Sequence, residues 1–181
     1  AFNGLDVLVE TAKELQERNV EDVVFLIYGY GNQEERLKKM AQDYNLQNIK
    51  FKGVLDKKYA MNLLTRGNLN IFTFANTALL KYGVSPNKLF MYFASGKPVL
   101  SMIKPAYDLV ESRKCGISVE NNPTAVADAI IKMSKLPEEE YRLYCSNART
   151  VAEEYDYGKL VNELIRIIER KRWEHVLEKV K

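Results

Sequence analysis

The sequence predicts an α/β fold in which a doubly wound parallel sheet is covered by helices and followed by a helical C-terminal tail. Short apolar, β-prone runs alternate with segments whose apolar residues recur at helical spacing, and short loops join them. This alternation is typical of βαβ units, because parallel strands need a crossover connection. No internal repeat or linker interrupts the 181 residues, so one domain with a tail is the simplest organisation.

The first half of the chain begins with a helix, because apolar residues recur at helical spacing between residues 5 and 15. Val23–Tyr28 is a continuous apolar run, as expected of a strand buried on both faces. The remaining elements of this half are a helix over 32–44, a strand over 49–54, a helix capped by Asp56 that runs to Leu64, and a strand over 69–74.

The second half contains the most clearly delimited helix. Ser85 is expected to be its N-cap and Pro86 its first helical residue, while Gly96 supplies the left-handed turn that ends it. The elements that follow are a strand over 98–103, a short helix over 107–112, a strand over 117–120, a helix started by Asn122 and Pro123 that runs to 133, a helix over 137–155, and a charged helix from 159 onward.

Composition and charge exclude several classes of protein. The chain is 46% hydrophobic and 28% charged, and 27 basic against 24 acidic residues give a net charge of +3. This charge is too small and too scattered for nucleic acid or a membrane surface to be the main partner. No apolar stretch approaches the roughly 20 residues of a membrane span. The absence of an initiator Met before the first helix suggests a piece of a longer chain.

Cysteine and histidine chemistry is also limited. Cys115 and Cys145 are the only cysteines, and His175 is the only histidine. Two cysteines are too few for a disulfide scaffold or a four-cysteine zinc site, so both are excluded. The single histidine leaves a Ser/His/Asp triad unsupported. We expect both cysteines to be ordinary thiols in a reducing compartment. We expect His175, which like Trp173 lies in the charged tail, to be a solvated side chain rather than a catalyst.

Three loops follow predicted strands and would meet at one edge of the sheet, where open α/β folds bind ligands. They are 29–32 and 53–56, each with glycines, and 81–88, which leads into the helix at Pro86. The first loop lacks the full GxGxxG pattern and the Walker lysine, so we favour its interpretation as a plain tight turn. For the second loop too, a plain turn is the favoured interpretation. The third offers free helix N–H groups and Lys88. Together the loops suit a ligand that contains a diphosphate.

The segment Ser85–Leu100 (SPNKLFMYFASGKPVL) resembles the signature of family 4 glycosyltransferases, retaining enzymes of the two-domain GT-B architecture. Asn3–Leu8, Phe25–Gly31, Ile49–Val54 and Pro123–Ile130 agree with the family in the same order. The resemblance implies a Rossmann-like fold, the C-terminal, nucleotide-sugar-binding half of such an enzyme, similar to bacterial transferases that build surface polysaccharides and lipopolysaccharide. It also implies that the family's first strand, and an acceptor-binding N-terminal domain, precede Asn3.

The resemblance places the donor on the three loops. Residues that would bind the diphosphate and the sugar are Gly29, Gly31, Gly83, Val84, Ser85, Pro86, Asn87 and Lys88, and those near the base and ribose are Gly53, Val54 and Met91. Two departures stand out. Gly83 and Met91 occupy positions at which the family often has glutamates, and Asn3 stands where it often has a lysine. We expect Lys88 to supply that lost charge, and we assign no catalytic residue.

The implied enzyme needs no metal, and no Asp-x-Asp pattern is present. The implied organisation is a donor-binding domain over 1–157 without its first strand and a C-terminal helix over 158–181, which either contacts the N-terminal domain or is solvated. The partners would be a nucleotide-diphosphate sugar and that domain, in the cytoplasm, with membrane contact, if any, through the N-terminal half. The chain alone would turn over nothing.

Three alternatives remain at this point. A non-catalytic nucleotide-sugar-binding or regulatory module fits the losses at Gly83 and Met91. Half of a nucleotide-sugar epimerase fits the architecture, although it suits the 85–98 pattern less well. A flavodoxin-like or response-regulator-like domain lacks support, because the sequence has neither an early acidic cluster for Mg²⁺ nor a Ser/Thr-rich flavin phosphate loop.

Overall fold

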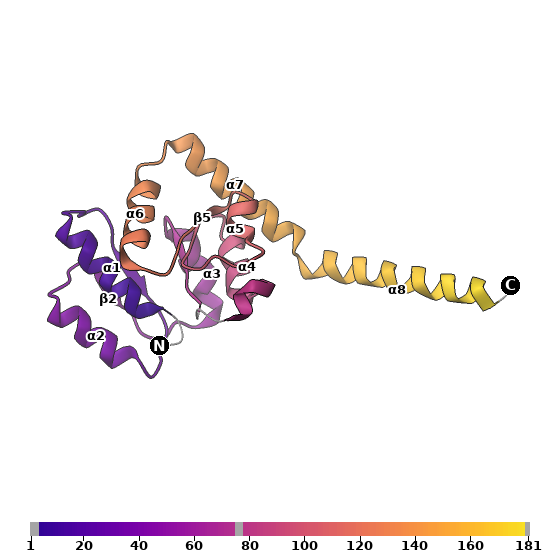
Figure 1. The fold of residues 1–181 in the computed structure, drawn as a ribbon, viewed down its shortest axis with the longest axis horizontal. Helices are drawn as coiled ribbons and strands as arrows, with labels where there is room; N and C mark the ends of the chain where they lie inside the picture. Colours follow the sequence, from indigo (N-terminus) through magenta and orange to yellow (C-terminus); the bar gives the residue numbers. More distant parts are fainter. Residues whose placement is uncertain (1–3, 75–77, 180–181) are drawn as a thin grey trace.

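Short parallel strands alternate with helices in the computed structural model, which describes residues 4–74 and 78–179, with side chains for 4–74 and 80–170 (Figure 1). The predicted α/β fold class is confirmed. The strands are β1 (Phe25–Ile27), β2 (Ile49–Phe51), β3 (Asn70–Phe72), β4 (Val99–Ser101) and β5 (Gly116–Ser118). The helices are α1 (Leu5–Glu17), α2 (Glu34–Asp43), α3 (Lys57–Arg66), the 3₁₀ turn η1 (Ala78–Tyr82), α4 (Asn87–Ala94), α5 (Leu109–Ser112), α6 (Pro123–Ser134), α7 (Glu138–Glu154) and α8 (Tyr157–Lys179).

The strands pair in two separate parallel ladders. β1 pairs with β2, with Phe25 opposite Ile49, and β4 pairs with both β3 and β5, with Val99 opposite Asn70 and Gly116. No hydrogen-bonded pairing joins β1 to β3 in the described part of the chain. The predicted doubly wound arrangement is therefore present as two half-sheets that face each other across a gap.

Strand β4 and the two residues after it separate two hydrophobic cores, because their side chains alternate between the faces of the sheet. Leu100 and Met102 belong to the core beneath α1, α2 and α6, whereas Val99 and Ile103 belong to the core beneath α4, α5 and α7. Val99 and Leu100 are both fully buried. Helices thus cover both faces, which is what a parallel sheet requires.

Cys115 is part of the second core, and Cys145 is half-buried on α7. Burial raises the pKa of the Cys115 thiol to about 12, although Arg113 nearby acts in the opposite direction. A buried thiol with a raised pKa is unreactive, because the thiolate is the nucleophile. Both thiols are free.

Side chains cap α3 and α6 as the sequence predicts, whereas the predicted cap of α4 is not formed. Asp56 accepts a hydrogen bond from the Lys58 N–H at 3.0 Å, and Asn122 accepts one from the Ala125 N–H at 2.8 Å, as predicted. The prediction for the helix near residue 86 was wrong by one position, because Pro86 is the N-cap and Ser85 makes no capping bond. Pro86 has an extended conformation (φ −80°, ψ 135°), so the helix begins only at the next residue.

Helix α8 projects away from the rest of the molecule (Figure 1). Its side chains at Leu160, Leu164 and Ile168 are 38%, 55% and 58% exposed, so this apolar stripe has no cover among the described residues. The side chains of Trp173 and His175 lie outside the described residues. None of the helices in the described ranges has the length and apolar character to cross a membrane. The predicted division of the chain near residue 157 stays a prediction.

Gly116 should be irreplaceable in this fold. A Cβ atom at this position would lie 1.8 Å from the carbonyl oxygen of Val99 in the paired strand. We expect Gly116→Ala to lower the free energy of unfolding by more than about 3 kcal/mol, because the ladder must separate to admit the methyl group. Urea unfolding followed by circular dichroism measures this loss.

The matched control is Gly67→Ala, whose Cβ would meet its nearest neighbour at 3.7 Å on an extended backbone (φ −69°). This variant should change the free energy of unfolding by less than about 0.5 kcal/mol. Equal losses in the two variants would contradict the close approach of β4 and β5.

Candidate ligand-binding site

The gap between β1 and β3 is the point at which the order of the strands reverses. From β1 the chain moves away to β2, and from β3 it moves in the opposite direction to β4 and β5. In open α/β sheets the crevice at such a reversal, beyond the carboxyl ends of the strands, is where ligands bind. A cavity of about 1110 Å³ occupies the gap, and residues of all three predicted loops line it.

The first two loops meet directly. The N–H of Gly29 donates a hydrogen bond to the carbonyl oxygen of Gly53 at 2.8 Å. Gly29 and Gly53 have left-handed backbones, with φ of 127° and 69°, which other residues adopt only with strain. No atom lies within 4 Å of a Cβ built at Gly29, Gly31 or Gly53, so the backbone there is open to a close-lying ligand. All three glycines line the cavity.

The third loop carries the start of α4 to the same cavity. No side chain caps α4, so its first N–H groups are left to a ligand or to water. Lys88, in the first turn of α4, lines the cavity, and the partial positive charge of a helix N-terminus favours anions beside it. A helix start with open amides and a lysine can stabilise a diphosphate.

The other predicted residues of the third loop stand beside the cavity rather than in it. Gly83 has a left-handed φ of 88°, and its N–H donates to the Leu80 carbonyl oxygen at 3.1 Å. Asn87 accepts a hydrogen bond from the Tyr157 hydroxyl at 3.4 Å. The five residues of this loop that were predicted to bind the donor and that do not line the cavity are Gly83, Val84, Ser85, Pro86 and Asn87.

The two remaining predicted residues are also outside the cavity lining. Val54 is 70% exposed beyond β2, and Met91 is 39% exposed on α4, one turn after the helix start. The structure therefore brings Gly29, Gly31, Gly53 and Lys88 together in the lining of one cavity, whereas Val54 and Met91 lie outside that lining.

Thr73, Arg36 and Tyr92 also line the cavity, although sequence reasoning did not select them. Thr73 directly follows β3, so its place at a strand's carboxyl end was a usable signal. Arg36 is already engaged, because its side chain bonds Gln33 at 2.7 Å and lies 3.7 Å from the Asp6 carboxylate. Burial raises the pKa of the Tyr92 hydroxyl, so Tyr92 stays neutral and polar.

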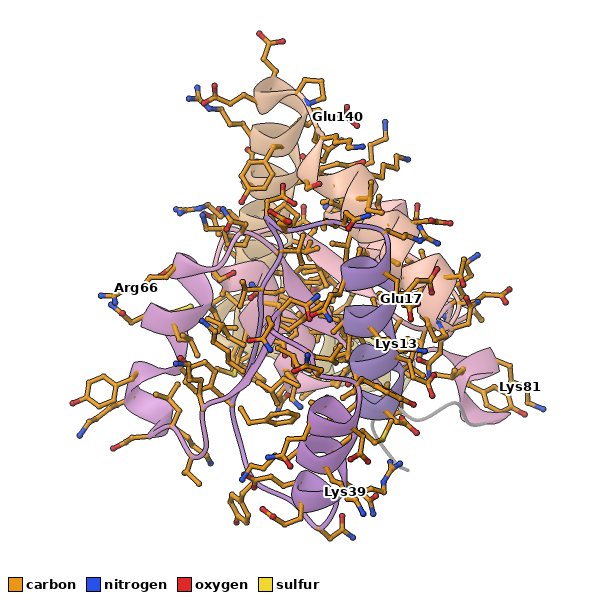
Figure 2. The ribbon with its side chains drawn as sticks, turned by 90° about the vertical axis from the view of Figure 1, so that its left-hand side faces the viewer. Lys13, Glu17, Lys39, Arg66, Lys81 and Glu140 are labelled. Atoms are coloured by element: carbon orange, nitrogen blue, oxygen red, sulfur yellow. The ribbon has the colours of Figure 1, made fainter. Side chains whose placement is uncertain are left out.

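The lysines of the third loop have different roles. Lys81 projects outward from η1, away from the body of the molecule (Figure 2), and its ammonium lies 4.9 Å from the centre of the Tyr82 ring. Lys88 instead lines the cavity. Within the described ranges, no group of three His, Cys, Asp or Glu side chains is placed to hold a metal ion. The prediction of a metal-free site stays a prediction.

Comparison with known proteins gives a family match. The family model described as "Glycosyl transferases group 1" matches residues 1–135. An uncharacterized glycosyltransferase of Methanocaldococcus jannaschii is 26% identical over 172 residues, which cover 93% of this chain and 42% of that protein. The chain thus spans less than half the length of this curated relative.

Solved structures share the fold. A glycosyltransferase from Rickettsia africae superposes with a TM-score of 0.76 at 21% identity, covering 94% of this chain and 45% of its own. WaaG, a glycosyltransferase involved in lipopolysaccharide biosynthesis, superposes with a TM-score of 0.68 at 16% identity. The match covers 91% of this chain and 43% of WaaG. The pneumococcal O-GlcNAc transferase GtfA, solved with UDP and GlcNAc, superposes with a TM-score of 0.69 at 16% identity. The match covers 92% of this chain and 33% of GtfA.

Two glycines of the first loop provide a matched test of its backbone. Both Gly29 and Gly31 have open space at the Cβ position, but only Gly29 has a left-handed φ. Gly29→Ala should lower the free energy of unfolding by about 1–3 kcal/mol because of strain, and Gly31→Ala by less than about 0.5 kcal/mol. Chemical denaturation of the two variants measures the difference, and identical midpoints would show that the loop does not hold this conformation in solution.

Proposed function

Since this chain belongs to the glycosyl transferases group 1 family, we propose that it is the nucleotide-sugar-binding half of a retaining GT-B glycosyltransferase. The donor would be a nucleotide-diphosphate sugar, and the acceptor a glycan or lipid-linked glycan of polysaccharide or lipopolysaccharide synthesis, in the cytoplasm or at the inner face of the membrane. The observation that carries the proposal is the meeting of Gly29, Gly31, Gly53 and Lys88 at the reversal of strand order.

Each part of the donor has a place in this proposal. The diphosphate lies over the glycine loop 29–31 and the uncapped start of α4, where backbone N–H groups and Lys88 offset its charge. The base lies against the backbone of Gly53 and Val54. The solved relative that contains UDP and GlcNAc supports this class of ligand for the family's fold.

In the proposed reaction, the bond between the anomeric carbon and the diphosphate oxygen breaks, and the diphosphate leaves with the electron pair. The acceptor hydroxyl oxygen forms the new bond on the face that the diphosphate left, and its proton passes to a base. The residues of this chain act on the leaving group, because donors aimed at developing negative charge lower the barrier. The base and the acceptor contacts would belong to the N-terminal domain, so this chain alone is expected to be inactive.

The residues at 83 and 91 favour a second candidate. Gly83 and Met91 carry no carboxylate at positions where the resemblance leads one to expect two. A non-catalytic nucleotide-sugar-binding module would retain the diphosphate contacts and lose the contacts that these carboxylates make with sugar and ribose. Turnover by the full-length protein separates this module from an enzyme.

Lys88→Ala should weaken nucleotide-diphosphate binding about tenfold, because a charge-assisted contact to a phosphate contributes roughly 1.5–3 kcal/mol before solvent weakens it. Isothermal titration calorimetry with UDP, GDP and their sugars measures the affinity, and NMR extends the range to weak binding. The matched control is Lys81→Ala, which removes the same charge from a side chain that points away from the cavity.

Affinity in the Lys81→Ala variant should stay within about twofold of the unmodified chain, since an exposed distant charge is largely screened. Equal losses of nucleotide affinity in the two variants would show that Lys88 does not contact the bound nucleotide. No saturable binding of any of these nucleotides, even by the full-length protein, would overturn the proposed donor site.

A further inference from the structure

We propose that Tyr30 holds the nucleobase of the donor by stacking its ring on one face of the base. This role rests on the proposed function, because it concerns the base of the nucleotide-diphosphate sugar. Tyr30 would add a side chain to a base site that otherwise consists of the backbone of Gly53 and Val54.

The ring of Tyr30 is open to a ligand. Its side chain is 84% exposed, more than any other large hydrophobic side chain that the structure describes. Within the described ranges it makes no hydrogen bond, ring contact or cation contact, whereas every other exposed tyrosine there has a partner. A lysine ammonium lies 4.9–5.1 Å from the ring centre of Tyr44, Tyr59 and Tyr82, and hydrogen bonds engage the hydroxyls of Tyr107 and Tyr157.

Tyr30 stands between two glycines at the mouth of the cavity. Gly29 before it and Gly31 after it both line the cavity, as Tyr30 does, and no atom lies within 4 Å of a Cβ built at either glycine. A flat ligand can therefore lie against this bare backbone and meet the Tyr30 ring beside it. Tyr28 and Tyr92 line the same cavity, but both are half-buried.

The second loop brings another apolar side chain to Tyr30. The Gly29 N–H donates to the Gly53 carbonyl oxygen at 2.8 Å, so the two loops stay side by side beyond the paired strands β1 and β2. Tyr30 and Val54 each follow one of these glycines, which makes them neighbours across the loops. Val54 is 70% exposed just outside the cavity lining. Two exposed apolar side chains beside glycine backbone form a place for an apolar, planar group.

A nucleobase is the part of the donor that fits this place. Its faces are apolar and planar and stack on aromatic rings, while its polar edge can bond to backbone groups. The diphosphate has no such face and is placed by the proposal on the helix start and Lys88. Tyr30 and Lys88 would therefore act on different parts of one ligand, and their effects can be measured separately.

The first experiment compares a ligand that has a base with one that lacks it. Tyr30→Ala should weaken the binding of UDP and GDP at least about fivefold, because stacking on the ring is lost. Binding of inorganic pyrophosphate, measured by the same calorimetry or by NMR, should stay within about twofold, whereas Lys88→Ala weakens it. Tyr30→Phe should restore most of the nucleotide affinity that Tyr30→Ala loses, because the ring and not the hydroxyl makes the contact.

The matched control is Tyr82→Ala, which removes another exposed tyrosine, 77% exposed on η1 and outside the cavity lining. Its affinity for all three ligands should stay within about twofold of the unmodified protein. Unchanged UDP and GDP affinity in Tyr30→Ala would overturn the role of Tyr30 and leave the donor site standing. An equal loss of pyrophosphate affinity would also overturn it, because the loop rather than the base contact would be responsible. Absence of nucleotide binding by the unmodified protein would overturn the proposed function and this role with it.

The second experiment detects stacking directly by fluorescence. Trp173 is the single tryptophan of the chain, so Tyr30→Trp adds one indole to a constant background. The emission that this variant gains should fall on saturation with UDP or GDP, because a stacked base quenches indole emission, and should not change with pyrophosphate. The control Tyr82→Trp should show no loss with any of the three ligands. Unchanged emission of Tyr30→Trp at saturation with nucleotide would overturn the stacking contact.

Discussion

The inner strands of a parallel sheet must be bonded along both edges and covered on both faces, and this requirement organises the whole molecule. Strand β4 meets it completely, because β3 and β5 pair with its edges and two cores cover Val99 and Leu100. β1 and β3 meet it on one edge only. The gap that results holds the cavity lined by the glycine loops and Lys88, and it is also the point at which strand order reverses.

The reversal has a chemical consequence. It directs the turns after β1 and β2 and the start of α4 to one rim, although they are far apart in sequence. The groups collected there include the backbone of the left-handed turns at Gly29 and Gly53 and the start of α4, which no side chain caps. Anion binding by such groups depends on the fold more than on side-chain identity. In the proposed function, the diphosphate site can therefore persist while the side chains at 83 and 91 have changed.

Many elements of the fold were predictable because local chemistry decides them. Asp56 and Asn122 accept hydrogen bonds from the N–H groups two and three residues further along the chain, respectively. A helix start of this kind can therefore be predicted from a few neighbouring residues. Ser85 was misread because Pro86 stays extended and itself occupies the cap position. The turn η1 was not predicted, since the segment before residue 83 has no regular apolar period. For the site, the glycine loops were visible as interruptions of apolar runs, but Arg36 and Tyr92 sit on helices without a distinguishing pattern.

The sequence by itself determined the α/β class, the order of the elements and the identity of the loops that follow the strands, because apolar periodicity, caps and glycines act over a few residues. Tertiary structure decided which of the predicted site residues share a cavity: Lys88 does, whereas Val54 and Met91 do not. It alone revealed that β1 and β3 face each other without pairing. Strand neighbours and helix orientations depend on contacts between distant segments, which no local pattern of residues encodes.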